Sequence, residues 1–139
     1  ETTTDNKNRT VANLRSYFNK LGGSLGVSGS VDYKFEHKCY FKFNSNDFDL
    51  EELELELIDY GIDELFIVNQ DTYVYAPFDN FGSIQKKLEN KSIKILSSDF
   101  ERIPINTVEL DELSKDLVYK LISLIEEDAD VLNVFSNLK

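Results

Sequence analysis

Cysteine, histidine and methionine are almost absent from this sequence of 139 residues, which has one cysteine, one histidine and no methionine. A single cysteine excludes a disulfide bond within the chain, and a lone thiol is typical of a reducing compartment. We therefore expect a cytoplasmic protein. Because no initiator methionine is present, we also expect the chain to be part of a longer protein.

Long apolar segments are missing as well. The apolar runs are short, such as Leu65 to Val68, whereas a helix that crosses a membrane needs about 20 apolar residues. The chain does not open with basic residues followed by an apolar run, as a secretory signal does. These absences predict neither membrane insertion nor secretion. Hydrophobic residues still make up 41% of the chain, which is enough for a folded core.

Positive charge is scarce and unevenly distributed, in a chain of net charge -11. Residues 1–30 hold four basic and two acidic residues, a net charge of +2, which leaves 11 basic and 24 acidic residues for the remainder. No lysine or arginine lies between Lys42 and Lys86, where eleven acidic residues accumulate. We expect this stretch to repel phosphate backbones and to form either a solvated helix face or a surface for a basic protein partner.

The first third of the chain predicts a helix, a loop and a strand. Apolar residues recur at helical spacing over residues 11–21, and Gly22-Gly23 is a typical stop signal. The segment from Gly22 to Ser30 holds four of the six glycines and predicts a loop. Val31 to Phe43 alternates as expected for two short strands or one bent strand.

Residues 38–97 predict a ferredoxin-like domain. A strand is followed by a helix that Asn46 or Asp47 could cap and Gly61 could end, and then by a hairpin over residues 65–76. Residues 81–88 predict another helix and residues 93–96 a last strand. The order β-α-β-β-α-β is that of the ferredoxin-like plan.

The two flanks predict a second, discontinuous domain. After the first helix and a strand at 31–35, the C-terminal flank offers strands at 100–103, 107–110 and 131–135 and a helix over residues 117–125. Neither flank can bury an apolar face alone, so we expect them to pack together. The prediction is an α+β fold of two domains, with residues 38–97 inserted into a smaller α+β domain made of residues 1–37 and 98–139.

Few residues could support catalysis or bind a metal. His37 and Cys39 would share one face of a strand, but they lack further ligands and an orienting group, so a buried pair is the main interpretation. The segment from Asn44 to Asp49 lacks the glycine and the final glutamate of a calcium-binding loop. The glycine-rich loop follows a helix and lacks the Gly-Lys-Ser/Thr ending of a phosphate-binding loop. We predict no enzymatic activity, no cofactor, no metal and no small-molecule substrate.

Four aromatic residues suggest a different kind of site. Phe41 and Phe43, with Tyr73 and Tyr75, lie on the two predicted strands whose aromatic residues stack bases in RNA-recognition modules. The basic signature of those modules is missing, and packing in the core is the alternative interpretation.

Several short motifs follow one another in an order that is specific to a known family, although no single motif is decisive. The motifs are Thr2 to Val11, Gly22 to Gly26, Ser28 to Val31, Phe35-Glu36, Tyr75 to Phe78, Glu101 to Pro104, Thr107 to Leu110 and Asp130 to Phe135. Together they cover essentially the whole chain and closely resemble the YebC/PmpR family.

The resemblance implies a three-domain protein, in which a basic helical N-terminal domain, absent from this chain, precedes two α+β domains. The family is described mostly as DNA-binding transcriptional regulators of bacteria. Its mitochondrial members look like translational activators, and bacterial relatives have been linked to the ribosome. The implied partner is DNA or ribosomal RNA, bound mainly through the absent domain, and both transcription and translation stay open. An acidic protein-interaction module is a further alternative.

Any contact with nucleic acid within this chain should fall on its positive segment. Basic side chains reach phosphates, and the backbone N–H groups of a glycine-rich loop can approach them closely. A charged helix flank followed by a structural turn is the alternative interpretation. The candidate residues are Lys7, Asn8, Arg9, Arg15, Lys20, Gly22, Gly23, Ser24, Gly26, Ser28, Gly29 and Ser30.

Overall fold

The computed structural model describes residues 1–46 and 48–139 of the chain, so Asp47, one of the two caps proposed for the second helix, lies outside the described residues. The chain forms two compact units. The central unit is Glu36–Ile103, and the terminal unit combines Glu1–Phe35 with Pro104–Lys139. The sequence predicted the divisions at 37/38 and 97/98, two residues after the first division and six residues before the second. Among the described residues, no helix is both long and apolar enough to cross a membrane.

The central unit has the ferredoxin-like order of elements, so this part of the predicted fold is confirmed. Its strands form one sheet in the order β2-β3-β1-β4. Each helix connects two strands that follow one another in sequence but are not neighbours in the sheet. The elements are β1 (Phe35–Asn44), α2 (Leu50–Ile58), β2 (Glu64–Val68), β3 (Asp71–Pro77), the short 3-10 turn η2 (Phe78–Asn80), α3 (Phe81–Asn90) and β4 (Ile95–Pro104).

Alternation along the two middle strands gives the sheet one buried face. β1 and β3 pair antiparallel, with Cys39 opposite Ala76, Phe41 opposite Val74 and Phe43 opposite Thr72. All six of these residues are completely buried. Since successive side chains of a strand point to opposite faces, the residues between them belong to the other face of the sheet.

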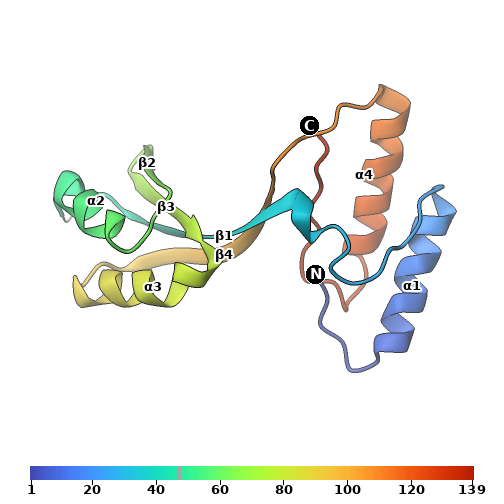
Figure 1. Ribbon diagram of the computed structural model, residues 1–139, viewed down its shortest axis with the longest axis horizontal. Coiled ribbons are helices and arrows are strands. Elements are labelled where there is room, and N and C mark those ends of the chain that lie inside the picture. The colour runs from blue at the N-terminus through green and yellow to red at the C-terminus, as the bar shows by residue number, and fades with distance from the viewer. Residues whose placement is uncertain (47) are drawn as a thin grey trace. The chain divides into compact units, whose positions relative to one another are not determined.

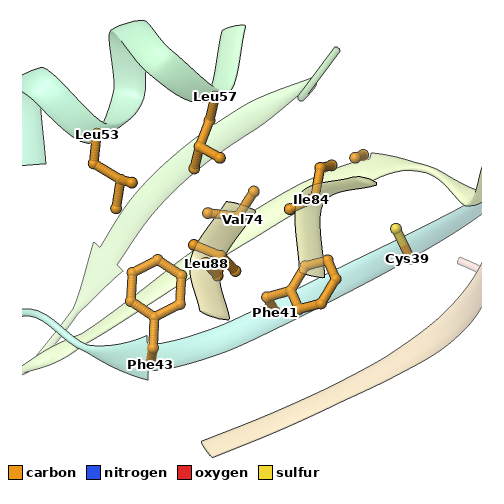
Figure 2. Packing of buried hydrophobic residues seen from close by; sticks show 9 residues of the cluster. Cys39, Phe41, Phe43, Leu53, Leu57, Val74, Ile84 and Leu88 are labelled. Atoms are coloured by element: carbon orange, nitrogen blue, oxygen red, sulfur yellow. The ribbon is translucent and has the colours of Figure 1, made fainter. Parts of the chain in front are cut away.

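The two helices of the central unit cover this buried face. Figure 2 shows Leu53 and Leu57 of α2 and Ile84 and Leu88 of α3 pointing toward the apolar residues of β1 and β3. These four helix residues are also completely buried. The leucine spacing in α2 and the Ile84–Leu88 spacing in α3 place each pair on one side of its helix. The hydrophobic core of the chain therefore lies between α2, α3 and the sheet.

Two local details of the central unit differ from the expectation. The side chain of Asp49, rather than Asn46, caps α2 by accepting from the backbone N–H groups of Glu51 and Glu52. Asn46 instead donates its backbone N–H to the side chain of Asn44. The strand predicted at 93–96 and the strand predicted at 100–103 are parts of one strand, β4, so the assignment of residues 100–103 to the other domain is wrong.

The terminal unit is built on two helices, α1 (Lys7–Lys20) and α4 (Glu112–Glu126), which lie side by side (Figure 1). The strands predicted at 107–110 and 131–135 are wrong, because only isolated bridges form there. Val108 pairs with Leu138, and Thr2 pairs with Val131. Both bridges are isolated, and neither belongs to a named strand.

The strand predicted at 31–35 is wrong as well. Residues Asp32–Lys34 form the 3-10 turn η1, in which the Lys34 N–H donates to the Val31 carbonyl. Val31 and Tyr33 are 54% and 74% exposed. Their β-forming side chains led to the expectation of a strand, but a strand needs a partner along its length. A backbone bond from the Ile105 N–H to the Lys34 carbonyl forms at the end of this segment.

Candidate nucleic-acid interface

Helix α1 carries all the basic candidates of the positive segment. It begins at Lys7 because the side chain of Asn6 accepts from the Arg9 N–H at 3.1 Å and the Asn6 N–H donates to the Thr4 hydroxyl at 3.0 Å. These bonds satisfy backbone groups that the first helical turn leaves without partners. Lys20 lies in the last turn, where a cation is favoured by the helix dipole.

Arg9 is held by two carboxylates. Its guanidinium lies 3.0 Å from Asp130 and 3.0 Å from Asp5. The hydrogen bond to Asp130 is the main reason why the pKa of Arg9 is raised. Its positive charge is therefore already opposed within the chain, which makes it a weaker attractor of phosphate than an unpaired cation on the same helix.

A cluster of hydrogen bonds around Asp130 joins α1 to the segment after α4, and no pattern in the sequence predicted it. The carboxylate of Asp130 accepts from the hydroxyl of Thr10 at 2.7 Å and from Arg9 at 3.0 Å. These two hydrogen bonds lower the pKa of Asp130. Thr10 is only 2% exposed, and its hydroxyl also bonds to that of Thr4 at 2.7 Å. We assign Arg9 and its neighbours a structural role in holding the two ends of the terminal unit together.

The remaining polar candidates on α1 are Lys7, Asn8, Arg15 and Lys20. All four are exposed, and among the described residues none of them forms an ion pair. At about 100° per residue, Lys7, Asn8 and Arg15 fall within one arc of about 100°, whereas Lys20 lies about 140° from Arg15. One flat surface can therefore meet the first three together, and Lys20 belongs to another side of the helix.

The glycine loop divides into a part that ends the helix and a part with available donors. The Gly23 N–H donates to the Phe18 carbonyl at 2.9 Å and the Gly22 N–H to the Asn19 carbonyl at 3.4 Å. With Gly22 at φ +80°, these bonds are a Schellman cap. The Ser30 N–H is used as well, by the Val27 carbonyl at 3.1 Å.

The backbone N–H groups that remain for a ligand lie in the middle of the loop. In the described part of the chain, those of Ser24, Gly26, Ser28 and Gly29 donate to no other group, and all four residues are exposed. Gly29 has φ +80°, a conformation that favours glycine. The carboxylate of Asp32 lies 3.4 Å from where a Gly29 side chain would begin. A negatively charged ligand at the loop would be repelled by this carboxylate at the Gly29 end.

The His37 and Cys39 pair occupies the end of the core. The ring of His37 stacks on Phe78, with the ring centroids 4.1 Å apart. Cys39 is completely buried, and burial raises the pKa of its thiol. A raised thiol pKa disfavours the reactive thiolate. Within the described residues no group of three or more His, Cys, Asp or Glu side chains is placed to hold a metal ion.

The four aromatic residues proposed as a stacking surface do not share a face. Phe41 and Phe43 are completely buried under the helices, so packing in the core, the alternative interpretation, is confirmed for these two residues. Tyr73 and Tyr75 alternate with buried residues of β3 and lie on the opposite face. The aromatic residues that accompany them there are Tyr40 and Phe66, which the sequence reasoning missed.

Some carboxylates of the acidic stretch form ion pairs or cap a helix within the central unit. Glu56 of α2 accepts from Lys87 at 2.6 Å and from Lys91 at 2.9 Å, which joins α2 to α3 and lowers the pKa of Glu56. Asp49 is the cap of α2. Other carboxylates of α2, such as Glu51 and Glu54, are exposed. Most of the negative charge therefore faces solvent, as a solvated helix face requires.

Comparison with known proteins identifies what the chain is similar to. Residues 1–138 match the family described as "TACO1/YebC second and third domain". A probable transcriptional regulatory protein of Flavobacterium johnsoniae is 54% identical over 139 residues, which are all of this chain and 59% of the relative. A protein of the same description from Porphyromonas gingivalis is 53% identical over 140 residues, which are 58% of its length.

A solved structure confirms the fold. The crystal structure of a conserved hypothetical protein of Aquifex aeolicus is 33% identical and superimposes with a TM-score of 0.72. The match covers 99% of this chain and 57% of that protein. The chain therefore spans a little under three fifths of the proteins that it matches. The resemblance expected from the motifs is confirmed.

Proposed function

The chain belongs to the TACO1/YebC family, and we propose that it is part of a regulator of transcription that binds DNA and catalyses no reaction. The observation that carries this proposal is the match to curated relatives described as probable transcriptional regulatory proteins, at 54% and 53% identity. Their names favour transcription over translation as the regulated step.

We propose further that DNA is held mainly by the part of the relatives that this chain does not span, a basic N-terminal domain. This chain is strongly acidic, with net charge -11, and DNA affinity depends on neutralising phosphates with basic side chains. The two units would then serve as a scaffold that adds a few contacts. Residues 1–37 plus 98–139, and the inserted residues 38–97, would be its two domains.

The added contacts would come from one side of α1 and from the loop that follows it. Lys7, Asn8 and Arg15 lie on one side of the helix. The backbone N–H groups in the middle of the loop can donate to phosphate oxygens. Arg9 and the two capping glycines would support this surface from within. Lys20 would contribute only to the electrostatic field.

The proposal is tested by titrating duplex DNA with a full-length protein in which this chain follows the preceding part of the Flavobacterium johnsoniae relative. The double variant Lys7→Gln/Arg15→Gln should weaken binding and reduce the slope of log affinity against log salt by roughly two, because two phosphate contacts are lost. The matched control is Lys86→Gln/Lys94→Gln, which removes two exposed lysines from the central unit.

Three outcomes separate the parts of the proposal. Equal salt slopes for the two double variants would remove α1 from the DNA contact while leaving DNA binding to the rest of the protein. An absence of binding to any duplex at low salt would contradict the proposed function itself. Binding by this chain alone, as strong as that of the full-length protein, would contradict the main role of the preceding domain.

A further inference from the structure

The face of the sheet that the helices leave uncovered carries four aromatic rings. Tyr40 lies opposite Tyr75, and Phe66 lies opposite Tyr73, with the four residues on β1, β3 and β2. We call these four residues the ring row. Because α2 and α3 pack on the other face, nothing in the described part of the central unit lies over the ring row as those helices lie over the core.

The rings form one continuous row across three strands. Tyr40 stacks on Tyr75 at 5.7 Å between ring centroids, Tyr75 on Phe66 at 5.9 Å, and Phe66 on Tyr73 at 5.4 Å. The last two pairs are nearly parallel, at 12° and 10°. Phe66 is 38% exposed, and the three tyrosines are half-buried. Aromatic rings that stack on one another and are fixed in a sheet form a rigid apolar surface, of which Phe66 is the most exposed part.

A cation of the chain itself already lies at one end of the row. The ammonium group of Lys42 is 5.8 Å from the centroid of the Tyr73 ring and 3.5 Å from the carboxylate of Asp71. This is the arrangement of a cation–π contact supported by a carboxylate. The contact shows that this face of the sheet can hold a positively charged group against an aromatic ring.

The middle of the row has carboxylates near it. Glu64 of β2 lies directly opposite Tyr75 of β3. Burial raises the pKa of Tyr75, and the negative charges of Glu101 and Glu64 raise it further. The other lysine of this face, Lys38, is held by Glu36 at 3.2 Å and Asp63 at 3.1 Å. The charges of both lysines of the face are therefore opposed within the chain, while Glu64 and Glu101 remain to attract an incoming cation.

We propose that the ring row binds an extended, arginine-bearing segment of a protein partner, with a guanidinium group placed against the exposed part of Phe66 beside Tyr75 and paired with Glu64. Arginine fits better than lysine because its planar group stacks on a ring while it donates to a carboxylate in the same plane. This site lies on the central unit and is independent of the DNA contact proposed for the terminal unit.

Nucleic acid is the less favoured occupant of the same rings. Bases stack on exposed aromatic side chains, but such sites lie in a positively charged groove. The central unit has the opposite field, with 15 acidic and 7 basic residues in Glu36–Ile103. A phosphate backbone along the ring row would meet Glu64 and Glu101 without a free cation to offset them.

The probe for this site is a fluorescein-labelled peptide of alternating arginine and glycine, with a lysine-glycine peptide for comparison. Fluorescence anisotropy at physiological salt should show weaker binding of the arginine peptide to Tyr75→Leu by roughly three- to tenfold, and to Glu64→Gln by roughly two- to fivefold. The matched controls are Tyr119→Leu and Glu54→Gln, which make the same changes at exposed positions on α4 and α2. They should change affinity by less than roughly twofold.

Folding and the choice of partner are checked separately. Tyr75→Phe keeps the ring and should keep the affinity, and if Tyr75→Leu fails to fold, Tyr40→Leu and Glu64→Gln decide the question in its place. Equal affinities for the ring variants and their controls would overturn the proposal. A single-stranded oligonucleotide that binds the chain and loses affinity in Tyr75→Leu would also overturn it and assign the ring row to nucleic acid.

Discussion

The central unit and the terminal unit are stabilised by different kinds of contact. The central unit encloses nine apolar residues that are completely buried, from Cys39 to Leu88. In the terminal unit, Ile125 and Thr10 are the buried residues among those described, at 7% and 2% exposure. Hydrogen bonds between segments that are distant in sequence contribute a larger share of the stabilising contacts there. Examples are the bonds from Thr10 and Arg9 to Asp130.

This difference predicts that the two units differ in stability. Burial of apolar area is the dominant favourable term in folding, so the central unit should unfold last and the terminal unit should open at a lower free energy. The proposed DNA contact lies on the less stable unit, and the ring row lies on the sheet of the more stable one. Amide hydrogen exchange should therefore be faster in α1 and α4 than in β1 and β3.

The largest effect is expected in the core of the central unit. Phe41→Ala should cost about 3–5 kcal/mol of unfolding free energy, because it leaves a cavity under α3. Phe18→Ala in α1, where the ring is half-buried, should cost only about 1–2 kcal/mol. Urea unfolding followed through the NMR amide signals of each unit measures both. Equal losses would show that the two units share one kind of core.

The next largest effect is expected at the polar cluster of the terminal unit. Thr10→Val keeps the shape of the buried side chain but leaves Asp130 and Thr4 without its hydroxyl, which should cost about 1–3 kcal/mol. The exposed Thr107→Val is the control and should have little effect. The same urea experiment reads out both variants. A loss in the central unit's signals alone would contradict the assignment of this cluster.

A smaller effect is expected at the start of α2. Asp49→Ala removes the cap and should destabilise the central unit by about 1 kcal/mol. Asp59→Ala, just after the same helix, removes a negative charge from its C-terminal end and should be neutral or slightly stabilising. Thermal unfolding by circular dichroism compares the two. If Asn46→Ala were the more damaging change, the cap would be at Asn46 after all.

The smallest effect is expected from pH. Hydrogen bonds from Thr10 and Arg9 lower the pKa of Asp130. The stability that these bonds contribute is therefore present above the unfolded pKa of about 4 and is lost as the pH falls through the folded pKa. Asp130→Asn should weaken the terminal unit at pH 7 and differ less from the parent chain at low pH. Chemical denaturation across this range measures the difference, and a constant difference would contradict the account.

Periodicity was enough to predict most of the central unit. Leu53 and Leu57 in α2, and Ile84 and Leu88 in α3, are spaced as apolar residues on one side of a helix are, and Gly61, with φ +80°, follows the end of α2. The faces of β1 were readable too, because Cys39, Phe41 and Phe43 alternate with residues that include two lysines. That alternation could have separated the core aromatics from the ring row.

The terminal unit was predicted less well for a physical reason. Its contacts join residues that are far apart in sequence, such as Thr10 and Asp130 at a separation of 120 residues, and a sequence pattern carries no record of them. Val31 and Tyr33 favour strands, but without a partner strand the chain turns instead. The candidate residues of α1 were found from charge alone, which could not show that Arg9 is paired.

The most direct measurement of the proposed division of roles is amide hydrogen exchange on the full-length chimaera with and without duplex DNA. The account predicts that DNA slows exchange at the start of α1 and in the middle of the Gly22 to Ser30 loop, and leaves Glu36–Ile103 unchanged. Protection of β1, β2 and β3 around the ring row, with none in α1 or its loop, would contradict it.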